Sequence, residues 1–375
     1  MIRKCFFVIL LFSFLSQSQQ KQLHFDLRYT GDFARNFSGG LNKGNLYIGM
    51  VEGEFELHSE AVSLWKGGTF FLHALHTHGE SVSALVGDLQ GVNNIEAFST
   101  LRIYQYGYRH EFKKGSISLG QNDLSADFIT SDLASLFIHN SFGIQPDVSS
   151  NVPLSIFPVT TLSVWGQWSL TQNWSFSSGV YKGYPGTQKE NLNSLSYKFD
   201  KGEGIFWVSE LHFQPQKENE IFGTYKVGFW KHTAKNLIVE SQKPGGIYFI
   251  ADQTLSFEEE NPAQWAAFLQ LGAAQKAAQT LTSYWGVGLI CEGLRAPEKQ
   301  ERFGVAYASA SLTDAFRREL GPNAQSNEDI LELTYTRSMG NFFSVQPNLQ
   351  FIFNPSGVPN SKSAWVGTLR FVFEL

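Results

Sequence analysis

The segment 342–375 constrains the fold most, because apolar and polar residues alternate along it with a period of two on either side of a Pro/Gly/Asn/Ser turn. In its final stretch Leu369, Phe371 and Phe373 share one face, and Arg370 lies on the other. This pattern predicts two β-strands, each with one apolar and one polar face. Such a strand suits a membrane barrel with lipid outside and water inside, but a soluble sandwich could bury the same face against a second sheet. The alternation alone leaves both architectures open.

The N-terminus favours export. Basic residues at 3–4 precede an apolar run at 5–15, and small residues follow, which predicts a cleaved signal peptide over residues 1–18. The run is too short to cross a bilayer as a helix, and no later segment offers about 20 uninterrupted apolar residues. The mature domain is expected to cover 19–375, where Cys291 has no second cysteine with which to form a disulfide.

The same alternation of apolar and polar residues continues through the mature domain, with turn signals between the strands. The alternating stretches are 45–57, 69–75, 95–109, 116–121, 161–170, 174–182, 205–213, 221–232, 246–255, 285–294, 303–312 and 330–337. Their spacing of about 20 residues per strand and loop predicts one domain of roughly 14 to 18 strands. A mean hydropathy of -0.17 despite 33 Phe residues fits this alternation, because each lipid-facing residue is matched by a polar one. The net charge of -5 argues against a nucleic-acid partner.

The stretch 261–282 is ambiguous. It is rich in Ala, Leu and Gln, so intrinsic propensity favours a helix. However, Trp265, Leu269 and Leu271 also alternate with neighbours such as Gln264 and Gln270, as in a strand. We predict a strand here, with the small residues marking tight packing or a bend in the wall.

Short motifs recur along the chain in a fixed order. They are WKGG at 65–68, GDLQ at 87–90, NIEA at 94–97, LGQND at 119–123, LF at 136–137, NSFG at 140–143, GTYKVGFW at 223–230, GGIY at 245–248, ADQ at 251–253, GVAY at 304–307, LE at 331–332 and VQPNLQF at 345–351. In this order they resemble the OprB family of carbohydrate-selective porins, over nearly all of the mature chain. The resemblance implies an all-β fold, a transmembrane antiparallel β-barrel of about 16 strands. It also implies passive diffusion of sugars across the outer membrane of a Gram-negative bacterium.

Three features depart from the family pattern. Asn348 stands where the family more often has Asp, 296–302 lacks the GR-x-x-D pattern, and the chain ends in Leu375 instead of an aromatic residue. The first two bear on which sugar is preferred. None of them alters the expected architecture.

A channel for uncharged sugars needs a wall that replaces the hydrogen bonds lost when a sugar sheds water, and rings that stack on its apolar face. Binding must stay weak, because tight binding would block passage. We therefore expect small carbohydrates as permeants and membrane lipid as surroundings, with no cofactor and no nucleophile.

Strand parity supplies candidate pore-lining residues. If Ile95 and Ile103 face lipid, the side chains between them at even positions turn inward. The candidates found in this way are Glu96, Arg102, Glu210, Trp230, Glu332, Gln346, Asn348 and Arg370. We expect the charged members to be exposed to water in the lumen, either as sugar ligands or in salt bridges that only solvate the wall. An alternative for Trp230 is an aromatic girdle at the membrane interface.

The stretch 121–158 is long and weakly patterned, which predicts a loop that folds into the channel. Asp123, Asp127 and Asn140 lie in it and are further candidates for contact with permeants. The alternative is an ordinary surface loop.

Other functional classes have weaker signals. His73, His76 and His78 resemble a metal cluster, but in a strand His73 points away from the other two. No G-x-S-x-G elbow, P-loop or G-x-G-x-x-G after a strand is present, so no enzyme is expected. The remaining alternatives to a sugar-preferring porin are a general size-limited porin and a secreted carbohydrate-binding β-sandwich. The sequence leaves open whether the barrel is a monomer or a homo-oligomer.

Overall fold

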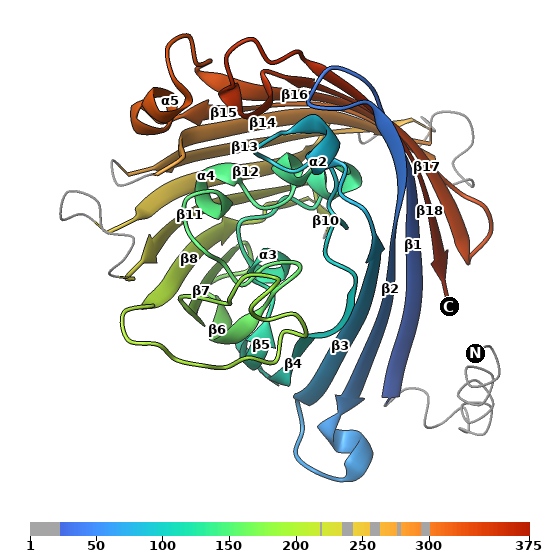
Figure 1. Cartoon of the computed structure of the whole chain (residues 1–375). Coiled ribbons are helices and arrows are strands. Elements are labelled where there is room, and N and C mark those ends of the chain that lie inside the picture. The colour runs from blue at the N-terminus through green and yellow to red at the C-terminus, as the bar shows by residue number, and fades with distance from the viewer. Residues whose placement is uncertain (1–22, 218–219, 235–242, 256–262, 276–278, 294–300) are drawn as a thin grey trace.

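The structure is a computed structural model that describes residues 23–217, 220–234, 243–255, 263–275, 279–293 and 301–375. The described residues form one closed antiparallel barrel, in which β1 pairs with both β2 and β18 (Figure 1). The predicted barrel is therefore confirmed and the sandwich alternative is wrong, because closure leaves no second large sheet to cover the outer face. The predicted signal peptide lies outside the described residues.

The barrel has 16 strands. They are β1 (Leu23–Ser38), β2 (Gly44–His58), β3 (Gly68–Gly79), β4 (Thr100–Phe112), β5 (Gly115–Asn122), β6 (Thr161–Ser169), β7 (Trp174–Lys182), β8 (Ile205–Phe213), β11 (Gly223–His232), β12 (Gly245–Thr254), β13 (Gln264–Ala274), β14 (Leu281–Glu292), β15 (Glu301–Leu312), β16 (Asn327–Ser338), β17 (Phe343–Phe353) and β18 (Ala364–Glu374). A small hairpin of β9 (Gln216–Lys217) and β10 (Glu220–Ile221) lies between β8 and β11.

The helices of the described residues are short. They are α2 (Ser83–Val86), α3 (Leu124–Asp127), α4 (Pro146–Ser149) and α5 (Asp314–Leu320), with 3-10 turns η2 (Ser59–Val62), η3 (Ala134–Leu136), η4 (Asn140–Phe142) and η7 (Pro355–Gly357). In the described part of the chain, no helix is long and apolar enough to cross a membrane.

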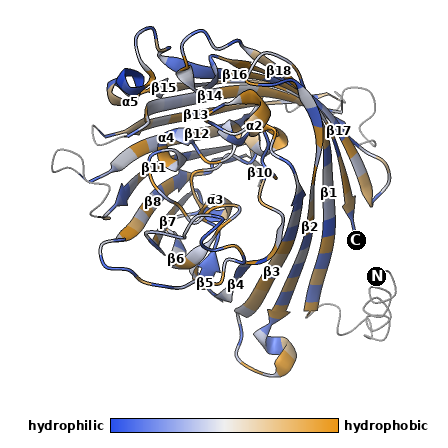
Figure 2. Ribbon diagram, viewed as in Figure 1, coloured by the Kyte–Doolittle hydropathy of each residue, from blue (hydrophilic) through white to orange (hydrophobic). Residues whose placement is uncertain are grey.

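The alternation that defines the strands is visible as stripes along β1, β2, β17 and β18 in Figure 2. On β18, Leu369 and Phe373 are exposed on the outer face, whereas Val366 and Thr368 are buried on the inner face. The period-two interpretation of the C-terminus is therefore confirmed. The apolar face is the outer face of the barrel.

Each of the twelve predicted stretches overlaps a barrel strand, although 221–232 begins before β11 and 285–294 ends outside the described residues. Within the ambiguous stretch, residues 264–274 form β13, as predicted, whereas 261–262 and 276–278 lie outside the described residues. The predicted strand at 95–109 is wrong at its start, because β4 begins at Thr100. The sequence analysis also missed β1, although Phe25, Leu27 and Tyr29 alternate there with polar residues.

Two long connections fold back into the barrel. We call residues 80–99, between β3 and β4, the first inner segment, and residues 123–160, between β5 and β6, the second inner segment. Figure 1 shows their helices α2, α3 and α4 inside the ring of strands. The prediction that the stretch after β5 enters the channel is therefore confirmed.

The hydrophobic core lies between these inner segments and the inner wall. Phe137 and Phe142 of the second inner segment pack against Phe268 of β13, with ring centroids 5.7 and 6.0 Å apart. The ring of Phe268 fits because the next strand has Gly288 opposite it, where a Cβ would overlap the ring. The barrel interior is thus a packed core over part of its wall and not an open tube.

Candidate functional site

The inner segments line a cavity of about 580 Å³ inside the barrel, which we call the lumen cavity. Its polar lining includes the carboxylates of Glu96 and Asp132 and the amides of Gln90, Asn94 and Asn140. Within the described lining there is no lysine or arginine. The cavity therefore offers mainly hydrogen-bond acceptors and neutral amides, together with hydroxyl groups from serine and threonine.

Aromatic rings share this lining. Phe137, Phe142 and Phe157 all line the lumen cavity. Apolar faces beside a set of hydrogen-bonding groups suit a ligand with both C–H and O–H surfaces, as a sugar ring has.

Glu96 and Asn140 are the two candidates that line the lumen cavity. Glu96 lies in the first inner segment and not on a strand, so its predicted placement is wrong. Its carboxylate accepts hydrogen bonds from the backbone N–H groups of Val82 and Ser83, at 2.9 and 3.2 Å, and so binds the start of α2. The expectation that Ile95 faces lipid is wrong as well, because Ile95 is buried in the core.

Glu210 and Glu332 point inward, but the expectation that water covers them is wrong. Both are fully buried beneath the second inner segment. Glu210 accepts a hydrogen bond from the backbone N–H of Ile129 at 2.7 Å, and Glu332 accepts bonds from Ile138 and His139 at 2.7 and 3.0 Å. The reason is that a chain segment packed inside a barrel must find acceptors for its backbone N–H groups, and the wall supplies them.

Gln346 and Asn348 on β17 support the same contact. The Gln346 side-chain amide donates to the carbonyl oxygen of Leu136 at 2.7 Å. The Asn348 amide donates to the Glu332 carboxylate. Gln346 therefore holds the second inner segment directly, and Asn348 holds the Glu332 carboxylate that binds it. Neither residue lines the lumen cavity.

The two arginine candidates are also buried. Arg370 forms a paired contact with the buried Asp32, with both N···O distances at 2.8 Å, and also donates to the side chain of Asn94 at 2.7 Å. Arg102 donates to the Thr77 hydroxyl and to the Phe98 carbonyl oxygen, each at 3.0 Å. The expectation that these arginines are exposed to water is wrong for both.

The remaining three candidates do not line the lumen cavity. Trp230 is buried on the inner side and stacks on Phe206, so the alternative of a lipid-interface girdle is wrong. Asp123 begins α3, where its carboxylate accepts the backbone N–H of Ser125 and the Tyr104 hydroxyl. Asp127 lies half-buried at the end of α3, and burial raises its pKa to about 8.

Several wall and loop residues escaped the sequence analysis. Glu328 accepts the backbone N–H groups of Leu89 and Gln90, and Asp252 accepts that of Asp132 at 2.9 Å. Glu328 could have been found by parity, because it lies four positions before Glu332 on the same strand. The aromatic lining could not, because its residues lie in a segment without periodicity.

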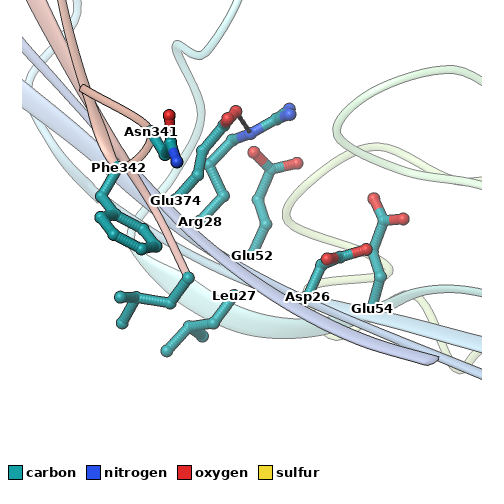
Figure 3. Close-up of a pocket in the computed structure, with 9 residues that line it drawn as sticks. Asp26, Leu27, Arg28, Glu52, Glu54, Asn341, Phe342 and Glu374 are labelled. Carbon is teal, nitrogen blue, oxygen red and sulfur yellow. Dashed lines mark hydrogen bonds and ion pairs between the residues drawn. The ribbon is translucent and has the colours of Figure 1, made fainter. Parts of the chain in front are cut away.

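A second pocket of about 300 Å³ lies where β1 begins and β18 ends. Figure 3 shows the carboxylates of Asp26, Glu52, Glu54 and Glu374 on one side of the wall there, and Leu27 on the other. We call this second pocket, with its four carboxylates, the acidic pocket. Arg28 pairs with Glu374 at 2.7 Å, and both side chains are about half exposed. These inward charges thus remain in contact with solvent.

The histidines follow the parity prediction. His73 is buried on the inner side near Glu52 and Glu54, whereas His78 stacks on Tyr29 of the outer face. The described residues contain no group of three or more His, Cys, Asp or Glu side chains that could hold a metal ion.

Burial shifts the pKa values of two side chains in the second inner segment. Burial raises the pKa of Asp147 in α4 to about 7 and lowers the pKa of His139 to about 3. His139 is therefore neutral at physiological pH. Asp147 lies against Gly272 of β13, where a Cβ would collide with its carboxylate.

Comparison with known proteins agrees with this architecture. Residues 43–375 match the family described as carbohydrate-selective porin, OprB family. Porin B of Pseudomonas aeruginosa is 21% identical, over 94% of this chain and 87% of that protein. A protein named putative porin QuiX, from Acinetobacter baylyi, is 20% identical over 94% of this chain and 89% of its own length.

Solved structures show the same fold. The high-pH structure of Pseudomonas putida OprB superposes with a TM-score of 0.83 at 20% identity, covering 95% of this chain and 94% of that one. Salmonella typhi OmpF, solved with daunomycin, has a TM-score of 0.59 at 8% identity, covering 96% and 99%. With most of its length matched, this chain belongs to the OprB family of carbohydrate-selective porins, outer-membrane β-barrels through which sugars diffuse passively.

Proposed function

We propose that the lumen cavity is the constriction of this porin and that small neutral sugars bind there weakly as they pass. The observation that carries the proposal is the lining, in which amides and carboxylates lie beside three phenylalanine rings. Amide groups both donate and accept, so Asn140 can replace the water that a sugar hydroxyl loses. The rings offer a surface for its C–H face.

Among the predicted site residues, we assign direct contact with sugar to Asn140 and Glu96. Asn140 has an exposed side chain, so its amide is free to meet a permeant. We assign the other nine candidates to supporting roles, because none of them lines the lumen cavity. We expect no catalysis in this cavity.

The test is sugar block of ion current in lipid bilayers. Replacement of Asn140 by Ala removes one hydrogen-bonding group, worth about 1 kcal/mol, so sugar block should weaken about five-fold. The matched control is Asn341→Ala, because Asn341 lines the acidic pocket and not the lumen cavity. A parent protein that admits sugars by size alone, without any block, would instead indicate a general diffusion porin.

Homo-oligomerisation forms a second part of the proposal. On the outer face of β1 to β3, the hydroxyls of Tyr29 and Tyr47 bond to each other, and His78 lies 3.4 Å from the Tyr29 hydroxyl. Polar groups facing hydrocarbon are unfavourable, and these side chains lie close along the wall because Gly31 and Gly49 leave room for the Tyr47 and His78 rings. We therefore place the contact between barrels on this face.

Light scattering in detergent tests the oligomer. The parent should have the mass of more than one barrel, and His76→Trp on this face should reduce that mass. Val227→Trp on the exposed outer face of β11 should leave it unchanged. A parent of single-barrel mass would contradict the assignment.

A further inference from the structure

Strand β16 carries two buried carboxylates on the same inner face. Glu328 and Glu332 are four residues apart, so the strand period of two points both inward. Neither side chain is exposed to solvent. Each accepts hydrogen bonds from two consecutive backbone N–H groups, an arrangement in which a single carboxylate uses both oxygens.

The two carboxylates hold different inner segments. Glu328 accepts bonds from Leu89 at 2.9 Å and Gln90 at 3.1 Å, both in the first inner segment. Glu332 accepts bonds from Ile138 at 2.7 Å and His139 at 3.0 Å, both in the second. One strand therefore fixes both segments.

The inner segments are joined to each other at the same place. The backbone N–H of Asn140 donates to the carbonyl oxygen of Gly91 at 3.0 Å, and the Ser141 hydroxyl donates to the Gln90 side chain at 2.8 Å. Gln90, His139 and Asn140 also line the lumen cavity, whereas Glu328 and Glu332 do not. The carboxylates thus touch the backbone that carries the lining and not the permeant.

We propose that Glu328 and Glu332 are positioning residues that set the width of the lumen cavity. In each acid both oxygens accept a backbone N–H at 2.7 to 3.1 Å, so these four bonds resist outward or inward movement of the segments. The inference rests on the proposed passage of sugars through the lumen cavity. In addition, the two wall carboxylates would set the size limit by holding the inner segments in place.

The decisive variant is Glu332→Gln. Glutamine keeps the size of the side chain but offers one acceptor oxygen instead of two, so one backbone N–H of the second inner segment loses its partner. We expect a single-channel conductance increase of at least about two-fold and a sugar size limit larger than that of the parent. Glu328→Gln should act in the same direction through the first inner segment.

The matched control is Glu54→Gln, which removes the same charge from an inward residue of the acidic pocket. It should leave the size limit at the parent value. Glu332→Asp keeps the charge and should restore part of the limit, which a loss of fold would not do. Heat-modifiable electrophoretic mobility establishes that each barrel is closed.

An unchanged conductance and size limit in closed Glu332→Gln and Glu328→Gln barrels would overturn the inference. If Glu332→Gln does not assemble, Glu328→Gln and Glu332→Asp decide by the same measurements. Ion conductance tests the positioning role of the two acids independently of the proposed passage of sugars. A parent that excludes every sugar refutes the proposed function, while the conductance ratio of variant to parent still decides the positioning role.

Discussion

Two ion pairs join the same two strands, β1 and β18, and differ in what covers them. Arg28 pairs with Glu374, and four residues along each strand Asp32 pairs with Arg370. The first pair is half exposed at the acidic pocket, whereas Asp32 is fully buried beside the first inner segment. Both pairs point inward, so direction alone does not decide whether a charge meets water. Whether an inward charge is exposed to water depends on whether an inner segment covers it.

The largest expected effect separates these two pairs. Arg370→Ala would leave Asp32 buried without its partner, which should cost about 3–5 kcal/mol of barrel stability. Arg28→Ala removes an exposed pair and should cost roughly 0–1 kcal/mol. Urea unfolding in detergent, followed by tryptophan fluorescence, measures both. Equal losses of stability in the two variants would show that burial beneath the inner segments does not change the contribution of an ion pair.

The outer face supplies the next effect. Phe371 lies next to Arg370 but on the opposite side of the wall, where it packs with Phe33 and Phe373. Phe371→Arg should destabilise the barrel by about 2–4 kcal/mol, because it places a charge against lipid. Phe371→Leu serves as the apolar control in the same unfolding assay. A harmless arginine at this position would refute the assignment of this face to lipid.

A smaller, local effect concerns pH. Asp147 docks α4 against β13 and β14, where Gln145 and Tyr284 are its polar neighbours, and burial raises its pKa to about 7. Since the docked acid favours its neutral form, docking is strongest below the ordinary pKa of 3.8 and weakens as the pH rises to 7. The loss is at most about 1.4 kcal/mol per pH unit.

Conductance between about pH 3 and pH 8, a range that spans both pKa values, should reveal this change. The parent should conduct more as the pH rises, because α4 is held less firmly. Asp147→Asn mimics the neutral acid and should flatten the profile, whereas Asp132→Asn, on an exposed side chain, should not. Parallel profiles for the parent and Asp147→Asn would remove Asp147 from this role.

The smallest effect on the fold is expected at the acidic pocket. Glu54 is half exposed there, so Glu54→Gln should change the free energy of unfolding by less than about 0.5 kcal/mol. The reversal potential in a salt gradient should nevertheless shift away from cation preference, because the pore mouth loses a negative charge. An unchanged reversal potential would mean that ions are selected elsewhere along the lumen.

Sequence reasoning predicted the architecture because alternation is a local property. The inward or outward direction of Phe371, Arg370 and Glu332 follows from a period of two within single strands, and the structure agrees with each. The boundaries of β4 and the absence of β1 from the prediction show its limits. A stretch such as 95–99 can alternate without a neighbouring strand to pair with.

The tertiary structure alone decided which of the candidate residues line the lumen cavity. Glu332 and Ile138 are separated by 194 positions, and no local pattern indicates that one will bind the backbone of the other. The inner segments have no periodicity, so their path follows from the unpaired N–H groups they must satisfy and the aromatic surface they must bury. The sequence therefore determined a barrel with charged residues inside. Packing of the inner segments determined that Glu210, Glu332 and Arg370 belong to its wall and that Glu96 and Asn140 line its cavity.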